Sequence, residues 1–381
     1  MKFEFGLWNY ADADKYIPDV SVTVNEWKEL GITLGCSYVT DGSEEQNARV
    51  KELISLCAAE NIKLFVYDKR VYLNYYTGDR QKYLENVRAA VKDFGGYENV
   101  VGFIFADEPT EKERLKMLDA IGIFKSVTNK IPFVNFSWCD GRIADYGSRE
   151  NYSEVLCETV KHGLSYMAND RYSCMHAKDY EPNFKETGID KYFADLNLFG
   201  GAARKSGVPY FVSLLSVGHW MYRTPDRHDI KWQLTTSFAH GANGIQWFFI
   251  NQHRHADDYY DYPVTIYGEK TQIYHDLVIQ SRVFKDKVLA PLDGYEFSRV
   301  FHIGKSYGGT PLLKKGDTDV FVWADHGMNG ILAELTKKGK KAYLIVNNDK
   351  QYPELFHTEY KNGAKDYRWL DAGGTRIVFC D

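Results

Sequence analysis

Short apolar runs alternate with longer amphipathic segments along most of the chain. The runs are rich in β-branched and aromatic residues and lack polar alternation, which predicts strands buried on both faces. The segments between them have apolar residues at helical spacing. The expected strands are Phe3–Asn9, Thr33–Tyr38, Lys63–Asp68, Val101–Asp107, Ile131–Phe136, Leu164–Ala168, Pro209–Leu214 and Gly244–Phe249. The expected helices are Thr23–Leu30, Glu44–Ala59, Arg80–Phe94, Thr110–Ser126, Asn151–His162, Ile189–Ser206, Asp229–His240 and Lys270–Lys285.

Several expected helices lead into the next strand through a short turn that contains Gly or Asn, as at Gly31, Asn61, Gly207 and Gly244. Such residues suit the left-handed position that closes a helix before a tight return. A series of eight strand–helix units predicts a (β/α)8 TIM barrel. A doubly wound open sheet is the alternative, but no Gly-rich phosphate loop follows the first strand.

The pattern changes from about residue 289. Short alternating runs follow, at Asp319–Trp323, Ile331–Leu335, Lys341–Val346 and Thr375–Phe379, separated by Gly, Asp and Asn. This pattern predicts a small antiparallel β-sandwich. We therefore expect a catalytic barrel over residues 1–288 and a C-terminal β-domain over residues 289–381.

The fourth expected strand ends in two adjacent carboxylates, Asp107 and Glu108, followed by Pro109. Adjacent carboxylates at the mouth of a buried strand repel each other and lose water, so the pKa of at least one should be abnormal, as a general acid requires. The structural alternative is that Asp107 caps the following helix and Glu108 complements its dipole.

Active sites of TIM barrels lie at the C-terminal ends of the strands. Polar and aromatic residues follow almost every expected strand here, although charged residues also end strands for solubility alone. The candidate substrate-binding residues are Trp8, Asn9, Tyr38, Tyr67, Asp68, Asn135, Trp138, Tyr172, His219, Trp220, Gln246 and Trp247. Carboxylates and amides bind sugar hydroxyls, and aromatic rings stack on sugar faces. The aromatic content of 15%, with 28 Tyr, agrees with such a surface.

Three segments resemble the glycoside hydrolase superfamily of TIM barrels, the β-galactosidase-like clan A type related to families 42 and 5. They are Gly-Phe-Ile-Phe-Ala-Asp-Glu-Pro at strand four, Asn-Asp-Arg-Tyr at strand six, and the run from Trp232 to Phe248 before and through strand eight. The resemblance implies hydrolysis of glycosidic bonds in an oligosaccharide or glycoconjugate. It also implies that Glu108 is the acid/base, with Asp107 in place of the usual sugar-contacting Asn.

The clan's nucleophile, a Glu at the end of strand seven, is missing from the segment Tyr210 to Ser216. A second carboxylate must then come from another strand, and Asp170 is the best placed, as general base or nucleophile. Asp107 is expected to point away from Glu108 because strand neighbours face opposite sides. Carboxyls that converge across the mouth would leave room for a water, so we expect any hydrolysis to invert the anomeric centre.

Other classes of function are less well supported. The net charge of -5 shows no footprint for nucleic acid, and six Cys without a Cys-x-x-Cys motif indicate neither a disulfide framework nor a zinc site. His253 and His255 belong to a run of possible metal ligands, but Arg254 between them argues against a metal. We expect no metal and no cofactor. A Ser hydrolase is disfavoured because no Gly-x-Ser-x-Gly follows a strand.

The alternatives are a non-catalytic carbohydrate-binding protein on a degenerate glycosidase barrel, which the missing Glu motivates, and a lyase or isomerase that uses Lys69 or the two His. The chain begins almost directly in a strand and has no membrane-length apolar stretch. We therefore expect a cytoplasmic protein as the sequence stands, or a secreted one if a leader has been removed, with a carbohydrate as partner and neither nucleic acid nor a membrane.

Overall fold

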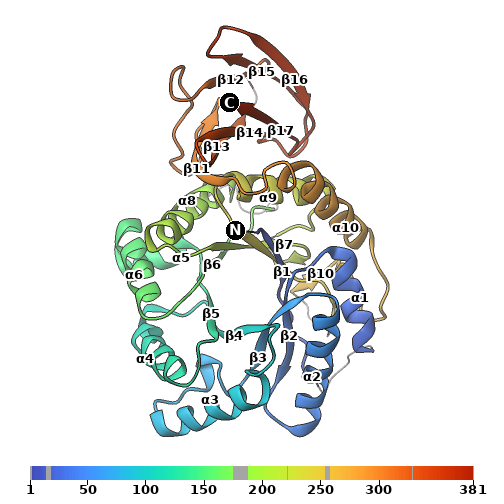
Figure 1. Cartoon of the computed structure of the whole chain (residues 1–381), viewed down its shortest axis with the longest axis vertical. Helices are drawn as coiled ribbons and strands as arrows, with labels where there is room; N and C mark the ends of the chain where they lie inside the picture. Colours follow the sequence, from blue (N-terminus) through green and yellow to red (C-terminus); the bar gives the residue numbers. More distant parts are fainter. Residues whose placement is uncertain are drawn as a thin grey trace.

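The computed structural model describes residues 2–13, 19–174, 188–220, 222–253, 258–327 and 329–380. Its centre is a sheet of eight parallel strands in the order β5-β4-β3-β2-β1-β9-β7-β6, which curls into a barrel (Figure 1). The strands are β1 Glu4–Leu7, β2 Leu34–Thr40, β3 Lys63–Asp68, β4 Val100–Asp107, β5 Ile131–Asn135, β6 Met167–Asp170, β7 Tyr210–Leu215 and β9 Gly244–Phe248. The two outer strands of this order meet through a parallel bridge between Phe136 and Asn169.

Helices surround the barrel. They are α1 Val20–Leu30, α2 Glu44–Ala59, α3 Arg80–Phe94, α4 Glu111–Val127, α5 Cys139–Tyr146, α6 Arg149–Lys161, α8 Gly188–Ser206, α9 Arg227–Ala239 and α10 Gln272–Phe284, with short turns η1 Leu73–Tyr75 and η2 Lys285–Leu289. Gly31 (φ 74°) and Asn61 (φ 58°) take the left-handed conformation expected where α1 and α2 turn into strands. The expected TIM barrel is confirmed.

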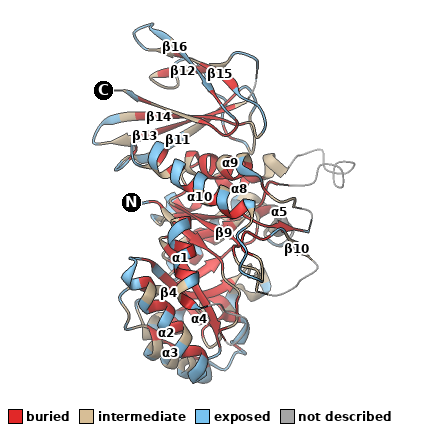
Figure 2. Ribbon diagram, turned by 90° about the vertical axis from the view of Figure 1, so that its right-hand side faces the viewer, coloured by how far each residue is buried: buried red, intermediate tan, exposed pale blue. Residues whose placement is uncertain are grey.

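Alternation along the strands divides the apolar side chains into two layers. Phe5, Leu7 and Trp247 point outward into the large cluster between the sheet and the helices. Trp8, Phe133 and Phe248 belong to a second, aromatic cluster that fills the barrel interior. Figure 2 shows the buried strands at the centre and exposed faces on the surrounding helices. The inner cluster supplies the floor of the barrel mouth.

Two features near the mouth were not expected from the sequence. Helix α5 follows β5 directly, and β8 Gly218–His219 pairs antiparallel with β10 Tyr259–Tyr260. This two-stranded sheet, the β8–β10 ribbon, joins the loops that follow β7 and β9, two neighbouring barrel strands. It therefore holds His219 and Tyr259 at a fixed place beside the barrel.

The C-terminal part consists of two antiparallel sheets, β11-β13-β14-β17 and β12-β15-β16. Their strands are β11 Glu296–Ile303, β12 Val320–Ala324, β13 Gly330–Lys337, β14 Lys340–Asn347, β15 Glu354–Tyr360, β16 Lys365–Leu370 and β17 Thr375–Cys380. A cluster that includes Val322, Tyr343 and Phe356 lies between the sheets. The expected β-sandwich is present, with β11, β15 and β16 in addition to the strands expected from the sequence.

The β-sandwich packs against α9 of the barrel. The indole of Trp232 donates to Asn348 Oδ1 (2.8 Å), and the hydroxyl of Thr235 donates to the carbonyl of Gly373 (3.2 Å). The proposed division between residues 1–288 and 289–381 falls inside η2, ahead of β11. Among the described helices, none combines the length and apolarity needed to cross a membrane.

Candidate active site

Strand β4 delivers two carboxylates to the mouth through an unusual backbone. The backbone of Glu108 has φ 46°, which lies in the left-handed region that residues other than Gly rarely adopt. Its N–H donates to the carbonyl of Asn135 (2.8 Å), and its own carbonyl accepts from Arg142 Nη2 (2.9 Å). The cap of α4 is Thr110, in a capping box with Glu113. Asp107 therefore does not cap this helix, and this half of the structural alternative is wrong.

Asp107 has donors on both carboxylate oxygens. Asn135 Nδ2 donates to Oδ1 (3.0 Å), and the hydroxyl of Tyr10 donates to Oδ2 (3.3 Å). Burial, with a further contribution from the charge of Glu108, raises the pKa of Asp107 to about 6 in spite of these two hydrogen bonds. One of the two adjacent carboxylates thus has the abnormal pKa that the sequence predicts.

Asp170, at the end of β6, has its carboxyl in hydrogen-bonding contact with that of Glu108. Burial and the charges of Glu108 and Asp107 raise the pKa of Asp170 well above its usual range. The charges of both β4 carboxylates therefore act on Asp170, while the oxygens of Asp107 are bound to Asn135 and Tyr10. The left-handed backbone at Glu108 breaks the alternation of an extended strand.

The contact between Glu108 and Asp170 is closer than either separation seen in glycosidases, roughly 6.5–9.5 Å in inverting enzymes and about 5–5.5 Å in retaining ones. The expectation of inversion assumed that the two side chains stand apart across the mouth. The structure places them together, so it gives inversion no support.

Tyrosines and other aromatic side chains surround the three carboxylates. Trp8 stacks on Tyr10 (ring centroids 5.9 Å, 5° between planes), and Tyr172 stacks on Phe248 (5.5 Å). The charge of Asp107 contributes to raising the pKa of Tyr10, Tyr67, Tyr72 and Tyr172, after burial as the largest cause. These phenols stay protonated at neutral pH and present O–H donors and ring faces to the mouth.

Three buried acceptors on the inner wall have no hydrogen-bond partner among the described residues. They are Asn135 Oδ1, Asp170 Oδ1 and Gln246 Oε1. Gln246 lies on the inner face because its neighbours Ile245 and Trp247 both belong to the outer cluster. Buried polar atoms are normally satisfied, so these three indicate a place for ligand O–H or N–H groups.

The β8–β10 ribbon supplies an aromatic and polar rim of the barrel mouth. His219 stacks on Tyr259 (4.4 Å, 6°) and on Trp220 (4.6 Å), and its ring lies 5.6 Å from that of Phe248. Its Nδ1 lies 3.2 Å from the carbonyl of Asp258, an acceptor, so Nδ1 carries the proton and Nε2 is left as an acceptor. Burial lowers the pKa of His219, which favours this neutral form. Trp138, on the strand-five side, has the guanidinium of Arg171 at 6.0 Å from its ring.

Two predicted stacking residues do not reach the mouth. Trp247 is fully buried in the layer between the sheet and the helices, and the inner position at the end of β9 belongs to Phe248. Tyr38 is buried in the same outer layer and donates to Thr23 Oγ1 (2.9 Å). The β2–β3 register shifts between Cys36 and Val39, which changes the alternation before Tyr38. Neither side chain can stack on a sugar held by the carboxylates.

Asp68 and Asn9 have other roles than the predicted sugar contact at the mouth. Asp68 is fully buried and pairs with Arg70, whose Nη2 lies 2.7 Å from Asp68 Oδ2 and 2.9 Å from Asp93 Oδ2. Asn9 accepts from the N–H of Ala11 (3.1 Å) and lines a separate pocket beside α1. Asp68 is thus a structural ion-pair partner, and its assignment to the substrate site is corrected.

Several residues at the mouth are not among the candidate binding residues. Tyr10 follows the first expected strand, so the sequence places it at the mouth beside Trp8. Tyr72 and Tyr222 lie in loops without periodicity, and Arg142 lies on the unexpected helix α5. Their proximity to the carboxylates follows only from the folded chain.

The described residues include no group of three or more His, Cys, Asp or Glu side chains arranged to hold a metal. His253 lies beside Phe249 (5.6 Å), whereas His255 and the neighbouring Arg254 and Asp257 are outside the described residues. The chemistry that the described mouth offers is that of carboxyl groups, phenols and amides.

Comparisons with known proteins show the fold. No family model and no curated protein matches the sequence. Among solved structures, the chain is similar to the cold-adapted β-galactosidase from Rahnella sp. R3 (TM-score 0.61, 10% identity, 100% of this chain and 98% of that chain). It is also similar to a glycoside hydrolase family 5 protein from Bacteroides vulgatus (TM-score 0.57, 10% identity, 100% and 86%). A third is the β-galactosidase from the psychrophilic Marinomonas ef1 (TM-score 0.55, 10% identity, 76% of this chain), of which the chain spans 60%. The chain therefore has the TIM-barrel fold of glycoside hydrolases, as the resemblance in the sequence implied.

Proposed function

We propose that this protein is a glycoside hydrolase that cleaves a glycosidic bond of an oligosaccharide or glycoconjugate by carboxylate acid–base chemistry. The observation that carries the proposal is the buried contact between Asp170 and Glu108 at the barrel mouth, beside Asp107. A protonated and an ionised carboxyl side by side are the two groups that glycoside cleavage requires. The likeness to glycoside hydrolase barrels agrees with this function but rests on fold alone.

The protonation of the pair favours specific roles. Because burial and two neighbouring negative charges raise the pKa of Asp170, this group keeps its proton to a higher pH than an ordinary Asp and is the better general acid. Glu108 is then the carboxylate that stabilises the oxocarbenium-like transition state and acts as base or nucleophile. This exchanges the roles implied by the resemblance, which made Glu108 the acid. In either assignment the bound sugar must enter between the two carboxyls and separate them.

The walls of the mouth suit a polyhydroxylated substrate. The unpartnered acceptors of Asn135 and Gln246 can each receive a sugar O–H, and the exposed ring of Trp220 offers a face for stacking. Asp107, with its raised pKa, can share a proton with a substrate hydroxyl near neutral pH. The partner we propose is accordingly a carbohydrate.

A screen of nitrophenyl glycosides and plant or gut oligosaccharides tests the proposal. We expect release of nitrophenol from at least one glycoside, and a loss of at least about 100-fold in kcat/KM in both Glu108→Gln and Asp170→Asn. The matched control is Glu98→Gln, since Glu98 is exposed just before the opposite end of β4. It should retain wild-type activity.

The second candidate function is carbohydrate binding without catalysis. It is favoured by one feature, the absence of a carboxylate in β7, whose last residues are Ser213, Leu214 and Leu215. If the wild-type protein binds an oligosaccharide without cleaving it, and Glu108→Gln binds equally well, this second function replaces the first.

A further inference from the structure

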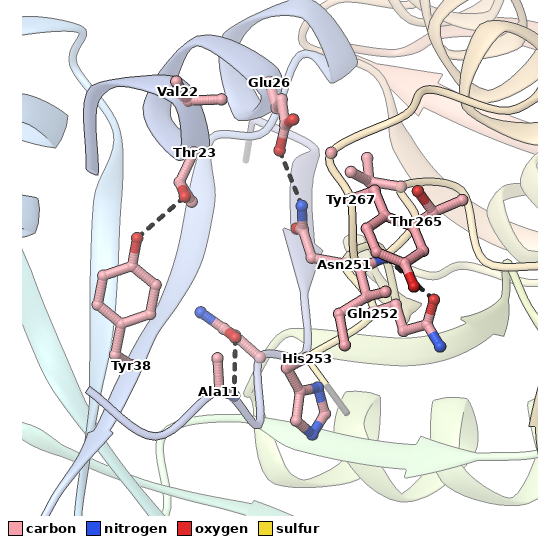
Figure 3. A pocket seen from close by; sticks show the side chains of 14 residues that line it. Ala11, Val22, Thr23, Glu26, Tyr38, Asn251, Gln252, His253, Thr265 and Tyr267 are labelled. Carbon is pink, nitrogen blue, oxygen red and sulfur yellow. Dashed lines mark hydrogen bonds between the residues drawn. The ribbon is translucent and has the colours of Figure 1, made fainter. Parts of the chain in front are cut away.

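A pocket of about 270 Å³ lies beside the barrel mouth, separate from the carboxylates (Figure 3). Its walls come from α1, from the ends of β1 and β2, and from the chain that follows β9. Asn9 and Ala11 face it, whereas Trp8 and Tyr10, which alternate with them, belong to the aromatic interior. The segment after β1 therefore separates this pocket from the barrel interior. Asp107, Glu108 and Asp170 are not among the residues that line the pocket.

The pocket contains a buried carboxylate that forms no direct ion pair among the described residues. The side chain of Glu26 is only 3% exposed, and its Oε2 accepts from Asn251 Nδ2 (2.8 Å). The nearby Lys270 is bound instead to Glu29, at 2.7 Å from its Oε2. Burial raises the pKa of Glu26, and the hydrogen bond from Asn251 and the charge of Lys270 only partly oppose this rise, so a cation bound in the pocket would stabilise the ionised carboxylate.

The remaining walls suit the body of a small organic molecule. Val22, Val264 and Ile266 provide apolar contact, and the ring of Tyr267, which is 78% exposed, lies at the rim. In Figure 3 the carboxylate of Glu26 and the amide of Asn251 come from opposite walls and meet at one end of the pocket. A ligand with one charged polar end and a compact body would match this division.

We propose that this pocket binds a small ligand with a protonated primary amine, such as an amino sugar, whose ammonium group pairs with Glu26. The ammonium donates to the free oxygen of Glu26, and the amide oxygen of Asn251 accepts a second N–H. The ring of Tyr267, at the rim of the pocket, offers a face for the body of the ligand. The site is independent of the proposed hydrolase activity, since none of its residues belongs to the carboxylate group at the mouth.

Glucosamine and glucose are matched probes, because they differ in one amine in place of one hydroxyl. With the full-length protein at neutral pH, we expect glucosamine to bind about tenfold or more tightly than glucose in isothermal titration calorimetry. Glu26→Gln should weaken glucosamine binding by about tenfold and leave glucose binding unchanged. Glu52→Gln, which removes an exposed carboxylate of α2, is the charge control and should bind as the wild type does.

Two further variants keep the test decisive. Tyr267→Ala changes an exposed side chain and should fold normally while it weakens glucosamine binding about two- to fivefold. Asp170→Asn alters the barrel mouth and should leave glucosamine binding unchanged. The proposal is overturned if glucose binds as well as glucosamine, if folded Glu26→Gln binds glucosamine like the wild type, or if Asp170→Asn rather than Glu26→Gln abolishes binding.

Discussion

The carboxyl group of Asp170 contacts that of Glu108, although the two residues lie 62 positions apart on strands β6 and β4. Two ionised carboxylates in such a contact repel each other, and this repulsion adds to burial in raising the pKa of Asp170. The left-handed backbone at Glu108 turns its side chain toward β6. This strained residue at the centre of the site is typical of positions where function overrides local preference.

The first prediction separates the roles of the two carboxyls. If Asp170 is the acid, Asp170→Asn should lose no more than about tenfold of its activity on dinitrophenyl glycosides, because their leaving group needs no proton. The same variant should lose at least about 100-fold of its activity on alkyl glycosides, whose leaving group must be protonated. Glu108→Gln should lose activity on both substrates, and added azide should restore part of it. Steady-state kinetics on the two substrate classes gives the answer. The opposite pattern would return the acid role to Glu108.

The overall fold was predictable because its signals are local. The helices Glu44–Ala59 and Arg80–Phe94 and the strand Lys63–Asp68 have the expected limits. Turn residues such as Gly31 indicate where helices end, and a regular alternation of strands and helices is compatible with only a few topologies. Helix α5 was missed because it is short and follows β5 without a connecting turn signal.

The candidate site was predictable only in part, since a sequence does not show which face of a strand points inward. Trp247 and Tyr38 are expected to point inward, but Trp247 alternates with the inner residue Phe248 and lies in the outer cluster, and an irregular register in β2 precedes Tyr38, which lies there too. Asp170 was placed at the mouth from its position on strand six alone. The roles given to it and to Glu108 stay predictions.

The second prediction concerns pH and stability. The pKa of Asp107 rises from 3.8 to about 6 on folding, so folding favours its protonated form. The protonation of Asp107 contributes at most about 3 kcal/mol to the free energy of unfolding. This contribution is fully present below about pH 4 and is lost as the pH rises through about 6. The free energy of unfolding of the wild type, minus that of Asp107→Asn, should therefore fall between about pH 4 and about pH 7.

Urea unfolding at several pH values measures this difference. Asp286→Asn, which removes an exposed carboxylate on η2, is a control and should change stability by no more than about 0.5 kcal/mol. A difference for Asp107→Asn that does not vary with pH would contradict the raised pKa.

The third prediction distinguishes structure from function at Asp68. Asp68→Asn removes one of the two carboxylates that pair with Arg70, whose side chain is only 16% exposed, and leaves Asp93 as the remaining partner. The substitution should lower the free energy of unfolding by about 2 kcal/mol in chemical denaturation, because it removes charged hydrogen bonds of a buried carboxylate, while kcat/KM of the folded protein stays near the wild-type value. Normal stability with impaired substrate binding would instead restore Asp68 to the site.

The last prediction concerns the rim. The indole of Trp220 is 62% exposed, stacks on His219 (4.6 Å) and donates to Asp258 Oδ2 (3.1 Å). An exposed side chain contributes little to folding, so Trp220→Ala should change stability by no more than about 0.5 kcal/mol. Loss of one stacking face should raise KM about three- to tenfold with kcat nearly unchanged, and Trp220→Phe should recover part of the loss. Trp369→Ala is the matched control, since that indole is 59% exposed on the β-sandwich. If both alanine variants raise KM equally, or if neither does, Trp220 does not contact the substrate.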